Sequence, residues 1–176
     1  MQCYLVLDLL NQNYKQGVAR LNDWMKPDNL SKWRDAPLAY INYLFAARLH
    51  YMAGNPAAAL DYLNAIRDNE KDFREATVIW YWFLYLLCYY QLNQPSLVYS
   101  TASSIYKKLL RQKKLYAPER AVLAFAKSTG SMDKMQKNMA KLHKTLSQLQ
   151  HDPLNQPFFQ LADYVDWLEA GLNNSK

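Results

Sequence analysis

The sequence predicts an all-α fold, an α-solenoid of about four antiparallel helical hairpins followed by a C-terminal capping helix. Only four glycines and seven prolines occur among the 176 residues, and they lie between segments whose apolar residues recur at helical spacing. The short turns within the hairpins are centred near residues 13, 54, 93 and 130, about 40 residues apart. Repetition at this period is typical of stacked units that bury their apolar faces only against each other.

The composition fits one folded domain with a substantial core. Apolar residues make up 51% of the chain and aromatic residues 14%, a composition that argues against a disordered chain. We therefore expect residues 1–176 to form a single domain. Cys3 and Cys88 lie in apolar helical segments without a CxxC motif, so we expect buried, reduced thiols in a cytoplasmic protein.

The first hairpin is expected to pair a helix from Met1 to Asn11 with one from Tyr14 to Met25. A strand is the alternative for the first segment, because Tyr4, Val6 and Asp8 alternate with leucines. No Ser, Thr, Asp or Asn precedes it as a helix cap, so we expect a fragment, the C-terminal domain of a longer protein. The segment also lacks the polar outer face of a terminal repeat. That lack predicts self-association through the N-terminal helix, or a missing N-terminal domain.

The second hairpin has the clearest boundaries. Leu38 to Met52 is expected to form one helix and Pro56 to Ile66 the next, and residues 27–37 a connector before them. Proline suits a first helical position because its missing N–H would be unsatisfied there anyway. Gly54 can take the left-handed conformation that ends the preceding helix. Helices joined by so short a loop must lie antiparallel.

The third hairpin is expected to pair Phe73 to Leu92 with Leu97 to Leu110. Within it, the run from Ala76 to Leu92 has 17 residues and no charge, which reaches the lower limit for a membrane span. Its tyrosines are spread along the run instead of gathering at the ends. We therefore favour a helix buried between neighbours and expect no membrane span, with a membrane-associated protein as the weaker alternative.

The fourth hairpin is expected over Ala117 to Ser128 and Met132 to Leu149, and the capping helix from about Pro157 to Leu172. The helix that begins at Met132 has the cleanest periodicity in the chain, which predicts one buried face. The apolar residues of that face, three or four positions apart, are Met135, Met139, Leu142, Leu146 and Leu149.

The turn sequence GNPAAALDYL resembles a known repeat. Counted from Gly54, a small residue lies seven positions before (Ala47) and five after (Ala59), with Leu63 nine after. This pattern resembles a tetratricopeptide repeat, in which small residues let paired helices approach closely. The stretch IYKKLLRQKKLYAPERAVLAFAK is similar to the C-terminal part of long uncharacterised bacterial proteins with tetratricopeptide-like repeats. The resemblance implies a right-handed stack and names no activity.

The same resemblance implies where a partner would bind. In tetratricopeptide-like stacks the first helix of each hairpin lines a concave groove that holds peptides, so we expect a non-catalytic protein–protein interaction or scaffolding domain. Aromatic rings beside arginine and lysine suit extended peptides with acidic or C-terminal carboxylate groups. The alternative is that the tyrosines pack against the next hairpin. The groove residues implied by the resemblance are Arg48, Tyr51, Tyr90, Gln91, Arg120 and Lys127.

The formal net charge of +6 comes from the second half of the chain. Residues 89–176 hold twelve basic and six acidic side chains, whereas residues 1–88 hold nine of each. Two helices gather cations at helical spacing, which could hold nucleic acid or another anionic surface through salt-sensitive contacts. A solvated face is the better-supported interpretation, since no aromatic residue interleaves the lysines. The cations are Lys107, Lys108, Arg111, Lys114, Lys134, Lys137, Lys141 and Lys144.

No pattern in the sequence predicts catalysis. His50 lies in mid-helix, His143 among lysines and His151 in a turn, without partners at catalytic or metal-ligand spacing. No HExxH, GxSxG or glycine-rich phosphate loop occurs. We therefore expect structural histidines, no catalytic residue, no bound metal and no cofactor.

Overall fold

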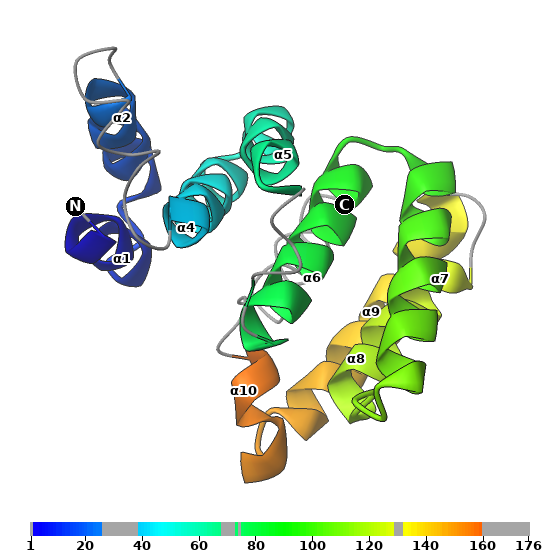
Figure 1. Ribbon diagram of the computed structural model, residues 1–176. Helices are drawn as coiled ribbons and strands as arrows, with labels where there is room; N and C mark the ends of the chain where they lie inside the picture. Colours follow the sequence, from blue (N-terminus) through cyan, green and yellow to red (C-terminus); the bar gives the residue numbers. More distant parts are fainter. Residues whose placement is uncertain (1, 26–38, 68–72, 74, 129–131, 160–176) are drawn as a thin grey trace. The chain divides into compact units, whose positions relative to one another are not determined.

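The computed structural model describes residues 2–25, 39–67, 73, 75–128 and 132–159 (Figure 1). Every regular element in this part of the chain is a helix, which confirms the predicted all-α class. The first segment is a helix and not the alternative strand. The connector over residues 27–37 and the turn near residue 130 lie outside the described residues. The chain divides into two compact units, unit 1 (Met1–Leu92) and unit 2 (Asn93–Lys176).

In unit 1 each helix packs on the next. Helix α1 packs on α2 and α4, α2 packs on α4, α4 packs on α5 and α6, and α5 packs on α6. The core between the first two helical pairs consists of Leu5, Leu9, Leu21, Ala46 and Leu49. The helices of unit 1 are α1 (Gln2–Leu10), α2 (Tyr14–Trp24), α4 (Ala39–Met52), α5 (Pro56–Ala65) and α6 (Glu75–Gln91).

In unit 2, α8 packs on both α7 and α9. Polar side chains then close the C-terminal end of α9. The Asn155 side chain donates to the Leu149 carbonyl (3.1 Å) and that of Gln156 to the Gln150 carbonyl (2.7 Å), so carbonyls that lack helical partners are satisfied. The expected capping helix is described only up to Phe159. The elements are α7 (Pro95–Arg111), α8 (Ala117–Lys127), α9 (Met132–Leu149), the 3₁₀ turn η2 (Pro153–Asn155) and α10 (Gln156–Phe159).

Three turns repeat one backbone geometry. Their left-handed residues, 42 and 39 positions apart, are Gln12 (φ 57°), Gly54 (φ 83°) and Asn93 (φ 54°). In the first two turns the N–H that follows reaches back five residues: Asn13 donates to the Asp8 carbonyl (2.9 Å) and Asn55 to the His50 carbonyl (2.8 Å). These bonds belong to the Schellman motif that ends many helices. The role predicted for Gly54 is confirmed.

Side chains at equal distances from these left-handed residues are buried in all three cases. Seven positions before the left-handed residue, the buried residues are Leu5, Ala47 and Leu86. Five positions after it they are Gly17, Ala59 and Val98, and nine positions after it they are Leu21, Leu63 and Ala102. This regularity extends the pattern that predicted the repeat. The three residues around Asn93, which are Leu86, Val98 and Ala102, lie on both sides of the boundary between the two units. The pairing of α6 with α7 as a hairpin therefore stays a prediction. A tetratricopeptide-like stack and its handedness stay predictions too.

Gly17 shows why one of these positions requires a very small residue. A Cβ atom on Gly17 would lie 2.8 Å from Cδ2 of Leu49 and 3.0 Å from Cβ of Asp8. Leu49 is fully buried, and the Asp8 carboxylate is paired with Arg20 at 2.9 Å. Helix α2 therefore lies against α1 and α4 at a separation that only glycine allows without a shift.

The aromatic helix α6 is stabilised within unit 1 by a stripe of tyrosines. Tyr81, Tyr85 and Tyr89 follow at intervals of four, and successive ring centroids lie 5.0 and 5.8 Å apart. The Tyr85 hydroxyl donates to the Asn64 side chain of α5 at 2.6 Å. This hydrogen bond and the ring contacts are typical of a helix that packs against other helices of the same protein. Within the described residues, no helix has the length and apolar character that a membrane crossing needs.

Candidate functional site

In unit 1, the structure places Arg48 at a contact between α4 and α6. Its guanidinium lies over the Trp80 ring, 5.6 Å from the ring centroid, and the Phe45 ring meets Trp80 edge-on at 6.2 Å. All three side chains are half-buried. The cation therefore packs on an aromatic surface between two helices, where it adds a stabilising cation–π contact.

The other predicted groove residues of unit 1 differ in exposure. Tyr51 is only 4% exposed, which favours the packing alternative over a groove contact. Tyr90 is half-buried, and burial raises the pKa of its hydroxyl. Gln91 is exposed at the end of α6. Of the four predicted groove residues of unit 1, Gln91 is thus the most accessible to a partner.

The remaining two predicted groove residues lie on α8 in unit 2. Arg120 is exposed, whereas the Lys127 ammonium sits over the Tyr106 ring of α7, 4.1 Å from its centroid. This cation–π contact ties α8 to α7 and gives Lys127 a structural role. The Arg120 guanidinium lies at the surface.

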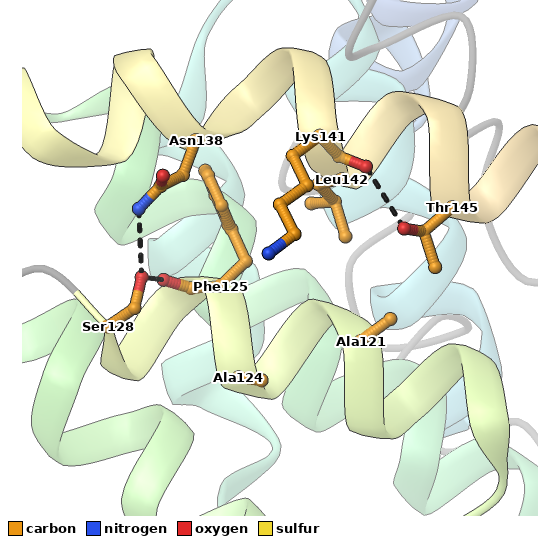
Figure 2. Close-up of a pocket in the computed structure, with 8 residues that line it drawn as sticks. All are labelled: Ala121, Ala124, Phe125, Ser128, Asn138, Lys141, Leu142 and Thr145. Atoms are coloured by element: carbon orange, nitrogen blue, oxygen red, sulfur yellow. Dashed lines mark hydrogen bonds between the residues drawn. The ribbon is translucent and has the colours of Figure 1, made fainter.

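The cations predicted to form an anionic-partner face also belong to unit 2. The described ones comprise exposed Lys107, Arg111, Lys141 and Lys144, and half-buried Lys108 and Lys114. The side chains of Lys134 and Lys137 lie outside the described residues. Lys141 is exposed, and its side chain projects towards the space between α8 and α9 (Figure 2).

The space that Lys141 enters is a groove of about 290 Å³, here called the α8/α9 groove (Figure 2). Its apolar floor includes Phe125 and Leu142, which are 7% and 4% exposed. The small side chains of Ala121 and Ala124 keep α8 from filling the space. The full lining consists of Ala121, Ala124, Phe125, Ser128, Asn138, Lys141, Leu142 and Thr145.

Hydrogen bonds fix the polar rim of the α8/α9 groove. The Asn138 amide donates to the Ser128 hydroxyl (3.4 Å), which itself donates to the Phe125 carbonyl (2.8 Å). The Thr145 hydroxyl donates to the Lys141 carbonyl (3.0 Å). One end of the groove is thus bridged by a weak side-chain contact between α8 and α9.

The charge carried by the lining of the α8/α9 groove is positive, from Lys141. None of its lining residues carries a carboxylate. Glu119, the acidic residue of α8, is 5% exposed, and burial raises the pKa of its carboxyl. A raised pKa shifts this group towards its neutral form, so Glu119 offsets the cations less than an exposed carboxylate would. The groove can therefore hold a small apolar group beside an anion.

Sequence reasoning missed the polar rim of the groove. Ser128, Asn138 and Thr145 match no motif, and each is ordinary on a solvated helix. One usable signal was the pair Ala121 and Ala124, small residues three apart on the exposed side of an otherwise amphipathic helix. Such a pair leaves room between helices, but the depth of the space depends on the neighbouring helix.

Burial changes the pKa of two titratable groups of unit 1, the Cys88 thiol and the His50 imidazole. The Cys88 thiol is fully buried, and burial raises its pKa to about 12, so the nucleophilic thiolate is suppressed at neutral pH. His50 is 6% exposed and stacks on Tyr62, with 5.2 Å between centroids. Among the described side chains, no three of His, Cys, Asp and Glu converge as a metal site requires.

His50 predicts a pH dependence of stability. Burial lowers the pKa of its imidazole, and the nearby Asp61 only partly opposes this. The unfolded chain then binds the proton more tightly than the folded one, so stability is fully present above the unfolded pKa of about 6.5 and is lost as the pH falls below it. His50→Phe keeps the ring stack and should reduce the difference between melting temperatures at about pH 7.5 and about pH 5.5. His151→Gln, in an exposed turn, is the control and should leave that difference unchanged.

Comparison with known proteins gives no match: no family model fits the sequence, and neither a curated protein nor a solved structure is significantly similar to it.

Proposed function

We propose that the chain is a non-catalytic protein–protein interaction domain that binds an acidic segment of a partner protein in the α8/α9 groove. The observation that carries the proposal is the Lys141 ammonium, which projects over an apolar floor without a carboxylate in the lining. The tetratricopeptide-like stack and the scaffolding role implied by the sequence belong to the same proposal.

The chemistry of the groove selects the kind of segment. A partner carboxylate beside Lys141 would form a charge-assisted hydrogen bond, which is stronger than a neutral one. An apolar side chain next to it would cover Phe125 and Leu142 and remove them further from water. Ala121 and Ala124 are small enough to let a peptide backbone approach.

Charges outside the groove would assist association. Arg120 precedes Ala121 on α8, and Lys144 lies one turn after Lys141 on α9; both are exposed. Exposed cations attract an acidic segment over distances of about 10 Å and raise the association rate more than the affinity. Binding should therefore weaken with added salt.

The test measures fluorescence anisotropy of a labelled peptide of about 12 residues that carries glutamate and leucine. Lys141→Glu should weaken binding about tenfold, because it places like charges together. Ala124→Leu fills the groove without changing charge and should weaken binding to a similar degree. Lys15→Glu, at an exposed position of α2 in unit 1, makes the same charge change and should alter the affinity less than about twofold.

Three results would count against the proposal. They are equal effects of Lys15→Glu and Lys141→Glu, full binding by Ala124→Leu, and equal affinity for a lysine-containing version of the peptide. Binding of generic duplex DNA, measured in the same way, distinguishes the proposal from the alternative of an electrostatic nucleic-acid binder. If DNA binds at low salt as tightly as the acidic peptide, and both are lost with a steep salt dependence, the cations of α7 and α9 serve an anionic polymer instead.

A further inference from the structure

Exposed apolar side chains gather at one end of unit 2. The three most exposed large apolar residues described in this unit are Leu110, Tyr116 and Leu154, which are 55%, 59% and 86% exposed. Leu110 lies in the last turn of α7, Tyr116 directly before α8, and Leu154 in η2, which follows α9. A partner that covers these side chains would remove apolar surface from water.

Antiparallel packing brings the three positions to the same end. Helices α7 and α8 are joined by residues 112–116 alone, and helices joined by so short a loop lie antiparallel. In the α8/α9 groove, Ser128 at the end of α8 meets Asn138 in the first half of α9 (Figure 2). Ala121 and Thr145 lie at the other end of the groove, so α8 and α9 are antiparallel too. The end of α7, the start of α8 and the end of α9 therefore lie together.

Three exposed cations are interspersed with these apolar residues. Lys107 and Arg111 lie three positions before and one after Leu110, so the three share one side of α7. Lys113 follows in the turn, where its left-handed backbone (φ 57°) lets its N–H donate to the Leu110 carbonyl (3.1 Å). This part of unit 2 is here called the basic end, and its exposed residues are Lys107, Leu110, Arg111, Lys113, Tyr116 and Leu154.

Carboxylates offset little of the charge at the basic end. Of the acidic side chains described in unit 2, Glu119 is 5% exposed, and burial raises the pKa of its carboxyl. Asp152 is exposed, and its carboxylate accepts a hydrogen bond from the Leu154 N–H (2.9 Å). Three exposed cations thus stand against one exposed carboxylate, and the basic end is both positive and apolar.

We propose that the basic end binds the surface of a bilayer that contains anionic phospholipids. Lysine and arginine side chains would meet the negative headgroups, which attract basic residues near the surface. Leu110 and Leu154 would enter the boundary of the acyl chains, and the Tyr116 ring would stay at the level of the headgroups, where tyrosine is enriched. Such a contact lies on the bilayer and crosses no part of it.

Nucleic acid fits the basic end less well than a lipid surface does. Its phosphates could meet the cations, but Leu110 and Leu154 offer no ring on which a base could stack. Two of the three exposed cations are lysines, which lack the bidentate geometry that makes arginine the preferred partner of nucleic-acid phosphates. The aliphatic side chains therefore decide between the two partners, because only the bilayer removes them from water.

Co-sedimentation of the full chain with phosphatidylcholine vesicles that contain about 30% phosphatidylserine tests this inference at about 0.1 M salt. Binding to pure phosphatidylcholine vesicles should be weaker by about tenfold or more. Lys107→Glu should weaken binding by about tenfold or more, because it removes one attraction and adds one repulsion, each worth about fivefold. Leu110→Gln should weaken binding by about threefold or more through the lost apolar contact.

Two matched controls make the same changes elsewhere. Lys15→Glu reverses an exposed charge on α2 in unit 1, and Leu97→Gln replaces an exposed leucine at the opposite end of α7. Both should alter vesicle binding by less than about twofold, and circular dichroism should verify that all four variants remain folded. No residue of the basic end lines the α8/α9 groove, so Leu110→Gln should leave peptide binding there unchanged. Vesicle binding and peptide binding can therefore fail independently.

A fluorescent label measures insertion directly. On a Cys3→Ser background, in which Cys88 is fully buried, the dye NBD attached to Leu154→Cys should brighten and shift to shorter wavelength when anionic vesicles are added. The same dye on Gln94→Cys, at an exposed position before α7, should not respond.

Three results would overturn the inference. They are absence of binding to the anionic vesicles, equal effects of Leu110→Gln and Leu97→Gln, and equal responses of the two labelled positions. Generic duplex DNA provides the last comparison. If DNA binds more tightly than the vesicles at the same salt concentration, and Leu110→Gln changes neither affinity, the basic end serves nucleic acid and the lipid inference is wrong.

Discussion

Gly17→Val is expected to lower the free energy of unfolding by about 2–3 kcal/mol, at the upper end of what overpacking costs in a tight core. Even the first added carbon would lie 2.8 Å from Cδ2 of Leu49 and 3.0 Å from Cβ of Asp8. The Leu49 side chain is fully buried and therefore cannot move outwards, and the Asp8 carboxylate is fixed by its ion pair with Arg20. Helix α2 must then move away from α1 and α4. Urea denaturation followed by far-UV circular dichroism measures the loss.

Two further variants identify the cause. Ala19→Val introduces the same side chain at an exposed position of α2 and should lower stability by less than about 1 kcal/mol, the cost of its weaker helix propensity. Leu49→Ala removes the atom that Gly17→Ala would strike, so the double variant should be more stable than the sum of the two single changes predicts. Strict additivity of Gly17→Ala and Leu49→Ala would show that the close contact costs nothing.

The helix boundaries were largely predictable because strong local signals mark them. Pro56 begins α5 as expected, Gly54 has the left-handed backbone, and α9 runs from Met132 to Leu149 as its periodicity predicts. Other left-handed residues were less visible. Gln12 and Lys113 both have a φ of 57°, although neither side chain favours that conformation. There the Schellman hydrogen bonds of the turn override the preference of the residue.

The orientation of side chains was harder to predict than the helices themselves. Helix α9 has apolar residues on one side only, and Met139, Leu142 and Leu146 are buried as expected. Helix α4 has apolar residues all round, so its sequence does not indicate which side faces a groove. Tyr51 is consequently buried although it was expected to meet a peptide.

The α8/α9 groove could not be read from either helix alone. Each contributes an ordinary amphipathic pattern, and the groove exists only because two small residues of α8 lie opposite Lys141 and Leu142 of α9. Lys141 was assigned to a solvated face from spacing, since periodicity counts residues along one helix and contains no information on its neighbour. A site formed between two helices needs their relative placement.

Leu63→Ala should cost about 2–5 kcal/mol of unfolding free energy, the range for a buried leucine whose surroundings collapse only in part. Leu63 is fully buried, and with Ala59 it forms the buried side of α5, which packs on α4 and α6. Leu110→Ala makes the same chemical change at a residue that is 55% exposed and should cost well under 1 kcal/mol. Urea denaturation compares the two variants.

Hydrogen exchange of Leu63→Ala also tests the serial packing of unit 1. If each helical pair is stabilised chiefly by its neighbours, loss of protection should be greatest in α4, α5 and α6 and smaller in α1 and α2, because stability in stacked repeats is a sum of local terms. Equal loss in all five helices would mean that unit 1 opens as one cooperative body. The contacts of α2 with α4 would then couple all the helices of unit 1, as the contacts of a closed core do. The solenoid prediction for this part of the chain would be wrong.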